Sequence, residues 1–167
     1  MKTLIVYASR FGYISDCTKM LKEKINDQVD IIDILKQKPT NLNEYDNILI
    51  GGSIKMGAIQ KQITSFCVKN MEVLLDKKIG LFIACAQIKS KDRYIKEAIP
   101  PRLVKHASDI QCFGGEYRNE QLNFFEKKMI NLLEKFAEQN NSDRPGPIFE
   151  NITTFATVFN KKIDKKN

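Results

Sequence analysis

The 167-residue chain contains no tryptophan and a single histidine, and each scarcity narrows what the protein can be. It also lacks any apolar run close to the roughly 20 residues that a membrane-spanning helix needs. At the N-terminus one lysine precedes a short apolar run, which is not the pattern of a signal peptide. The sequence therefore predicts a cytoplasmic protein, with peripheral membrane association left open.

Cysteine is present but not in a metal-binding or redox pattern. Cys17, Cys67, Cys85 and Cys112 form no C-x-x-C pair, and two of them fall within predicted strands. Small buried hydrophobic side chains are the favoured interpretation, ahead of disulfides or a metal. Because His106 is the only imidazole and the cysteines are scattered, the sequence predicts no metal site.

Composition indicates one globular domain spanning residues 1–167. Apolar residues make up 43% and charged residues 28%, which is ordinary for a folded protein of this length. The net charge of +7 is unusual and is compatible with nucleic acid, an anionic membrane surface, an anionic ligand or simple solubility. No motif combines basic and aromatic residues, so we expect no nucleic-acid partner.

The first stretch that indicates a binding site is the turn after the opening strand. An apolar run over residues 4–8 leads into Ser9, Arg10 and Gly12, and helical spacing begins near Cys17. Backbone N–H groups and the helix dipole at such a turn can hold a phosphate without a lysine. The loop is too short for G-x-G-x-x-G and lacks G-K-[ST], which favours a single terminal phosphate. An ordinary strand-to-helix turn remains the alternative.

Strands and helices then alternate along the chain. Further strands are predicted over residues 29–34, 46–52, 78–86 and 109–115, and helices over 58–75, from 93 to 107 with a break at Pro100 and Pro101, 120–138 and 152–163. This alternation predicts an α/β fold with a parallel sheet. Right-handed crossovers place the strand-following loops 9–15, 51–57, 86–93 and 114–119 at one edge, as candidates for one shared site.

The order of these elements resembles the flavodoxin superfamily. That resemblance implies a flavodoxin-like three-layer sandwich, with a five-stranded parallel sheet of order 2-1-3-4-5 and helices on both faces. Two motifs, Tyr-Ala-Ser-Arg-Phe-Gly at 7–12 and Ile-Gly-Gly-Ser-Ile-Lys-Met-Gly at 50–57, are most similar to the flavodoxin-domain branch containing menaquinone-dependent protoporphyrinogen IX dehydrogenase. The similarity is good to about Gly115 and looser beyond it.

The resemblance implies flavin mononucleotide (FMN) as the cofactor. Flavodoxins usually have hydroxyl side chains where this chain has Phe11 and Ile14, so backbone N–H groups would hold most of the phosphate. Without a tryptophan to stack on the flavin, the expected ring neighbours are Ile54, Met56 and Ile88, with Tyr13 or Tyr94 as further candidates. The loop around the phosphate would comprise Ser9, Arg10, Phe11, Gly12, Tyr13, Ile14 and Ser15, and the ring would lie between Ser53, Ile54, Lys55, Met56 and Gly57 on one side and Ala86, Gln87 and Ile88 on the other.

Charge near the predicted flavin favours an enzyme over a carrier. Residues 86–106 hold six basic side chains against two acids, and Arg10 and Lys55 stand in the other loops. A positive charge at about 4 Å would favour an anionic reduced flavin by roughly 1 to 4 kcal/mol. This suits an FMN-dependent oxidoreductase that passes electrons to a quinone or redox protein and accepts an anionic substrate such as a porphyrinogen.

Three alternatives stay open at this stage. One is a flavodoxin-like carrier without its own substrate, and another is a family member that has lost its flavin. The third concerns residues 116–149, which are either an insertion before the C-terminal helix or an ordinary sheet-covering helix. No catalytic side chain is predicted, because the helix bearing His106 should run towards the far edge of the sheet.

Overall fold

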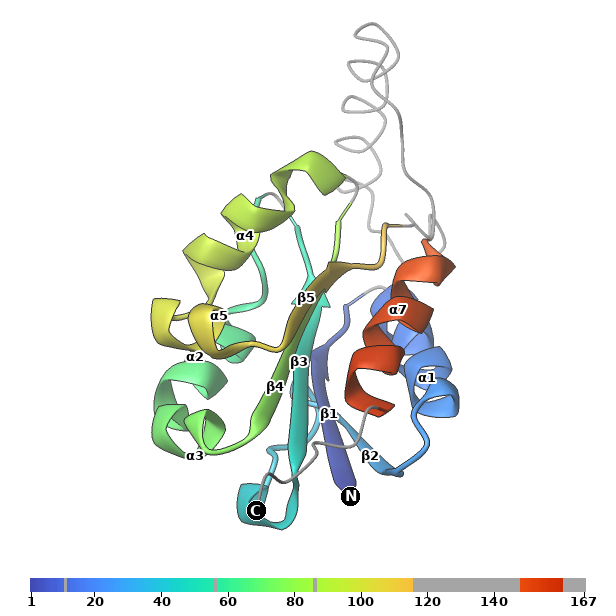
Figure 1. The fold of residues 1–167 in the computed structure, drawn as a ribbon. Coiled ribbons are helices and arrows are strands. Elements are labelled where there is room, and N and C mark those ends of the chain that lie inside the picture. The colour runs from blue at the N-terminus through green and yellow to red at the C-terminus, as the bar shows by residue number, and fades with distance from the viewer. Residues whose placement is uncertain (11, 56, 86, 116–147, 161–167) are drawn as a thin grey trace, which may run out of the picture.

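The computed structural model describes residues 1–10, 12–55, 57–85, 87–115 and 148–160, and its centre is a five-stranded parallel sheet (Figure 1). The strand order is β2-β1-β3-β4-β5, which confirms the predicted α/β fold and topology. The edge strand β2 is the least buried of the first four, as its two aspartates suggest. The strands are β1 (Lys2–Ala8), β2 (Gln28–Asp33), β3 (Asn47–Ser53), β4 (Lys78–Ala84) and β5 (Asp109–Cys112).

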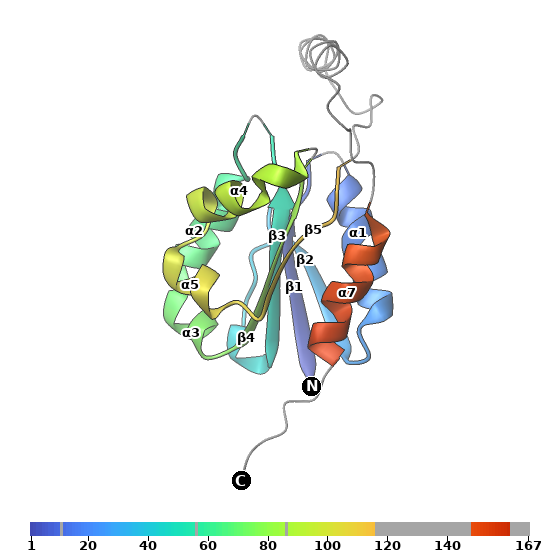
Figure 2. The same ribbon diagram turned by 45° about the horizontal axis from the view of Figure 1, so that its top comes forward.

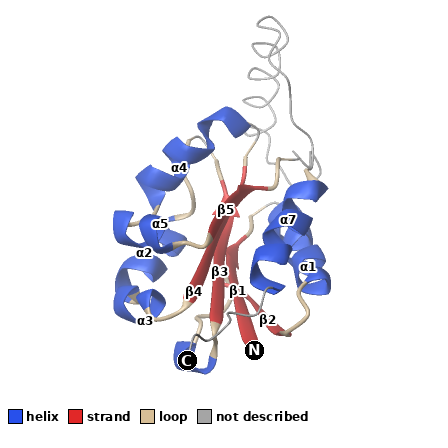
Figure 3. Cartoon of the chain, in the orientation of Figure 1, coloured by secondary structure: helices blue, strands red, loops and turns tan. Residues whose placement is uncertain are grey.

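Helices cover both faces of this sheet (Figures 2 and 3). On one face lie α1 (Tyr13–Lys24) and α7 (Phe149–Asn160), which contact each other. None of the described helices is long and apolar enough to cross a membrane. The other face carries α2 (Lys61–Lys69), α3 (Met71–Leu75), α4 (Lys91–Ala98) and α5 (Pro101–His106), with short 3-10 turns η1 (Leu42–Glu44) and η2 (Ile88–Ser90) in the connections.

One predicted helix differs from the structure. The single helix predicted over 58–75 is wrong, because the backbone leaves helical geometry at Asn70 (φ −112°, ψ 18°) and divides the segment into α2 and α3. The amide of Asn70 donates to the Phe66 carbonyl at 2.9 Å, a local bond that competes with helix continuation. The break at the prolines is confirmed between α4 and α5. The helix predicted over 120–138 lies outside the described residues.

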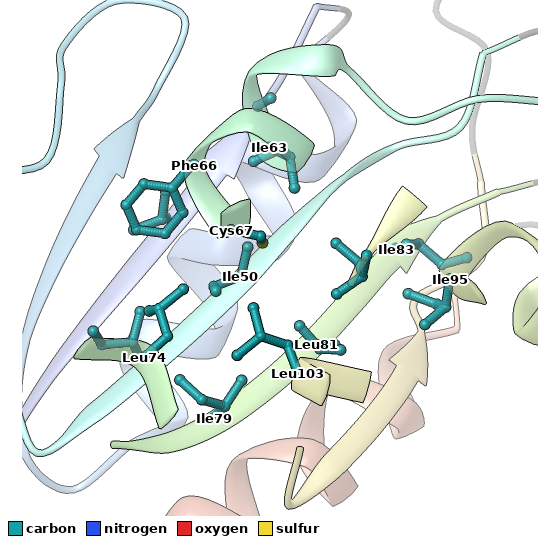
Figure 4. Close-up of a cluster of buried hydrophobic side chains, with 14 of the residues drawn as sticks. Ile50, Ile63, Phe66, Cys67, Leu74, Ile79, Leu81, Ile83, Ile95 and Leu103 are labelled. Atoms are coloured by element: carbon teal, nitrogen blue, oxygen red, sulfur yellow. The ribbon is translucent and has the colours of Figure 1, made fainter. Parts of the chain in front are cut away.

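The face under α2 to α5 is a conventional aliphatic core. Alternate residues of β1, Leu4 and Val6, point to this side and are fully buried. Further along the sheet, Ile50 and Leu81 meet side chains of the covering helices (Figure 4). The helices contribute Ile63, Phe66, Leu74, Ile95 and Leu103, whose spacing produced the helical pattern in the sequence.

The opposite face, under α1 and α7, is aromatic. Phe82 stacks on Phe113 with ring centroids 5.1 Å apart, and Phe155 meets both rings edge-on. Gly51 and Gly80 make this packing possible. A Cβ on Gly51 would lie 2.5 Å from the Phe82 carbonyl oxygen, and one on Gly80 would lie 2.6 Å from the Phe155 ring.

Replacing Gly51 with alanine should therefore destabilise the fold. The added methyl meets backbone as well as a ring, and overpacking of this kind costs about 1 to 3 kcal/mol. Urea unfolding followed by circular dichroism measures the loss. Val68→Ala is the control, because that side chain is 58% exposed and should shift the free energy of unfolding by less than about 0.5 kcal/mol. Equal urea midpoints for Gly51→Ala and the parent would contradict this packing, because they would show that a methyl group fits between β3 and the Phe82 ring.

Candidate functional site

The carboxyl ends of the strands meet at one edge, where the candidate loops leave the sheet (Figure 1). Register places Ala8 beside Gly52 and Ser53 beside Ala84. Hydrogen bonds continue this alignment beyond the strands, since the Ile54 N–H donates to the Ala84 carbonyl at 2.8 Å and the Phe113 N–H to the Ile83 carbonyl at 2.9 Å. The points at which the chain leaves β1, β3, β4 and β5 are thus neighbours, as predicted.

The loop after β1 places the N-terminus of α1 at this edge. Gly12 has φ 81°, a left-handed value that favours glycine, and it directly precedes the helix. Its N–H donates to Ser9 Oγ at 3.1 Å, closing a tight turn. An α-helix leaves its first N–H groups without partners inside the helix, and in α1 these include the N–H groups of Ile14 and Ser15.

The hydroxyl groups near this turn differ from the predicted set. Ile14, at a position where flavodoxins usually have a hydroxyl, is fully buried in the aromatic-side core and so contributes packing. Ser15 Oγ lies 3.1 Å from the Tyr7 hydroxyl, which sequence reasoning missed. Tyr7 is the penultimate residue of β1 and lies on the same face of the sheet as Ile5, under α1. The alternation of side chains along a strand could therefore have predicted that Tyr7 lies near α1.

The two tyrosines considered as flavin neighbours are buried, and their hydroxyl groups donate hydrogen bonds to other residues. Tyr13 is buried and its hydroxyl donates to the Phe113 carbonyl at 2.6 Å, which ties the start of α1 to the end of β5. Tyr94 is also buried and donates to Gln87 Oε1 at 2.9 Å. Ile54 and Ile88 are half-buried and remain at the edge. Phe11, Met56 and Ala86 lie outside the described residues.

A tight turn follows β3. Lys55 and Ala58 exchange two backbone hydrogen bonds of 2.8 and 3.1 Å, and Gly57 between them has φ 82°. A Cβ on Gly57 would meet nothing within 4 Å, so this position faces open space. Close by, Gln60 Oε1 is buried beside Gly52 and has no hydrogen-bond partner among the described residues. An unsatisfied buried acceptor at this edge fits a ligand that brings an N–H or O–H donor.

The basic side chains do not all converge on the site. Lys91 Nζ donates to the Ile110 carbonyl at 3.2 Å, and the Arg93 guanidinium lies 4.9 Å from the Tyr94 ring centroid. Arg102 pairs with Glu72 at 2.9 Å on the helical face. Arg10, Lys55 and Lys89 belong to the segments that follow β1, β3 and β4, whereas Lys96 and Lys105 are exposed on α4 and α5.

His106 Nε2 lies 2.8 Å from the carbonyl of Lys77, just before β4 begins, so it sits at the opposite edge as expected. In the part of the chain that the structure describes, no three histidine, cysteine or acidic residues gather as metal ligands. The edge offers backbone N–H groups, hydroxyls and one open acceptor, a donor set suited to a phosphorylated heterocycle.

Comparison with known proteins agrees with this geometry. The sequence profile of the family described as "Flavodoxin domain" matches residues 4–143. A search of curated protein sequences found no match.

Solved structures of the same fold include three flavodoxins. One, from the domain Archaea, has a TM-score of 0.53 at 18% identity and covers 81% of this chain and 98% of its own. The Streptococcus pneumonia TIGR4 flavodoxin has a TM-score of 0.52 at 13% identity, covering 95% and 97%. A Fusobacterium nucleatum flavodoxin bound to flavin mononucleotide scores 0.55 at 12% identity, covering 93% and 95%. At these identities the likeness establishes the fold.

Proposed function

The chain belongs to the flavodoxin domain family, and from that membership we propose that it binds FMN and transfers electrons as a flavoprotein. The observation that carries the proposal is the N-terminus of α1, held by Gly12 at the loop edge of the sheet. One structural neighbour is a flavodoxin bound to FMN, which supports the choice of flavin. When bound, FMN supplies the redox chemistry, and the protein positions it and sets its electrostatic surroundings.

The phosphate is assigned to the loop at 9–15. The N–H groups of Ile14 and Ser15 would donate to it, assisted by the Ser9 and Ser15 hydroxyls. Gly12 sets the turn, and its own N–H is engaged by Ser9 Oγ. Asp16 follows in the first helical turn, but its carboxylate pairs with Lys19 at 3.1 Å, which limits repulsion of an anion.

The ring is assigned to the space beside the turn after β3 and the loop after β4. Residues 53–57 would lie on one side and 86–88 on the other. Gln60 Oε1 is the open acceptor at this place and would receive a hydrogen bond from the ligand. The Tyr94 hydroxyl donates to Gln87 Oε1 and so helps to hold the Gln87 side chain in place.

Titration of the flavin-free protein with FMN tests both the function and the loop. The parent should quench FMN fluorescence on binding. Gly12→Val should weaken binding at least 100-fold, because a branched side chain disfavours φ 81° and crowds the phosphate. The same change should lower the free energy of unfolding by only about 1 to 2 kcal/mol, the cost of a left-handed residue.

Phe159→Leu is the matched control for stability. That ring packs in the core near Lys78 at the far edge of the sheet, so the variant should be less stable yet bind FMN normally. If the parent does not bind FMN, the proposed function is wrong. If Gly12→Val loses affinity no more than Phe159→Leu does, the turn is merely structural.

The reaction we assign is that of an oxidoreductase resembling the protoporphyrinogen dehydrogenase branch. Support comes from the sequence similarity at 50–57 and from Arg10, Lys55 and Lys89 around the site, which suit an anionic substrate such as a porphyrinogen. A quinone or redox protein would take the electrons, and a quinone would require contact with a membrane surface. The second candidate is an electron carrier without its own substrate, favoured by the engagement of Lys91, Arg93 and Arg102 elsewhere.

Removing the site charges should separate these candidates. In Lys55→Gln/Lys89→Gln the midpoint potential of bound flavin should fall by roughly 10 to 40 mV, because two partly screened charges no longer favour the anionic reduced form. Redox titration at low ionic strength measures it. Lys96→Gln/Lys105→Gln removes the same charge from α4 and α5 and should leave the potential near that of the parent. Equal potentials in all three proteins would refute the electrostatic argument and favour the carrier.

A further inference from the structure

Two cysteines meet at the loop edge of the sheet. Cys85 directly follows β4 and Cys112 ends β5, and their sulfur atoms lie 3.3 Å apart in a buried contact. Register pairs Cys112 with Ile83, so Cys85 lies two residues further along the neighbouring strand and on the same face. The two side chains therefore face each other because of strand pairing and not through a mobile surface loop.

The other two cysteines provide an internal comparison. Cys17 belongs to the core beneath α1, and Cys67 is fully buried on α2. Burial alone raises the pKa of the Cys67 thiol to about 12, so it stays protonated and unreactive. All four cysteines are buried, and the sulfur atoms of Cys85 and Cys112 are in direct contact.

The surroundings of the pair favour a thiolate on Cys112. The contact with the Cys85 sulfur lowers the pKa of Cys112, and the Gly114 N–H acts in the same direction against the effect of burial. The same contact raises the pKa of Cys85, which keeps its proton. The Lys91 ammonium, anchored on the Ile110 carbonyl next to the pair, adds positive charge. Strand pairing thus holds two thiols within reach of each other beside a positive charge.

We propose that Cys85 and Cys112 form a reversible intrachain disulfide when a small hydroperoxide reaches them. The Cys112 thiolate attacks a peroxide oxygen, so that an S–O bond forms, the O–O bond breaks and hydroxide leaves. The Cys85 sulfur then attacks the Cys112 sulfenic acid, forming the S–S bond and releasing water. Two thiols and one hydrogen peroxide yield one disulfide and two waters. This chemistry does not depend on FMN.

The disulfide would change the loop after β4. In the reduced chain the Cys85 thiol donates to the Gln87 carbonyl at 3.5 Å, and Gln87 Oε1 in turn accepts from Tyr94. Oxidation consumes the thiol hydrogen and removes the first of these contacts. The loop at 86–88 should then loosen, and since we place it beside the flavin, an effect on FMN affinity rests on the proposed function.

Peroxide treatment of the flavin-free protein tests the disulfide directly. Thiols counted after unfolding should fall from four to two and return to four with dithiothreitol. Mass spectrometry of non-reduced digests should find the fragments containing Cys85 and Cys112 joined within one chain. Hydrogen exchange over residues 87–94 should be faster in the oxidised protein. A bulky aromatic disulfide should react far more slowly with the folded protein, because Cys85 and Cys112 are only 3% and 1% exposed.

Matched variants separate this pair from the remaining thiols. Cys67→Ser should still lose two thiols to peroxide, whereas Cys85→Ser should form no intrachain link. Should Cys85→Ser fail to fold, the digest of the parent still decides the matter. The proposal is wrong if the parent keeps four thiols, if the links join different chains, or if Cys112 is converted to sulfinic acid while Cys85 remains a thiol. Unchanged exchange over 87–94 would reject the loop coupling.

Discussion

Four phenylalanine rings can pack under α1 and α7 only because β3 and β4 present glycine to that face. Gly51 and Gly80 leave the space that Phe82, Phe155 and Phe159 fill, and Phe113 stacks on Phe82. The carbonyl of Phe113 then accepts the Tyr13 hydroxyl at 2.6 Å, which fixes the start of α1 beside the end of β5. Core packing on one face thereby sets the position of the helix N-terminus on which the proposed phosphate site depends.

The fold could be predicted from sequence because its signals are local and periodic. Apolar runs gave the strands, helical spacing gave the helices, and parallel pairing placed the loops together. The division of the helix at Asn70 could not be foreseen, because the apolar residues keep helical spacing on both sides of it. The hydrogen bond of Tyr13 could not be foreseen either, because its partner, the Phe113 carbonyl, lies 100 residues away in sequence. The residues predicted to contact FMN stay predictions.

The positions of the charged side chains at the site could not be predicted from sequence either. Sequence predicts a basic segment at 86–106, but only the structure distinguishes Lys89, which is exposed beside the site, from Lys91 and Arg93, which contact β5 and Tyr94. The choice between enzyme and carrier therefore depends on where a few basic side chains lie. The sulfur pair at the same edge was equally hidden, because Cys85 and Cys112 are 27 residues apart and meet only through strand register.

The central claim is that backbone donors at the N-terminus of α1 hold the terminal phosphate of the flavin. Calorimetric titration of the flavin-free protein with FMN and with riboflavin, which lacks that phosphate, tests it most directly. Loss of one or two charge-assisted hydrogen bonds, about 2.7 kcal/mol, predicts riboflavin binding about 100-fold weaker than FMN binding. Equal affinities for the two flavins would contradict the account and show that the loop at 9–15 is not a phosphate site.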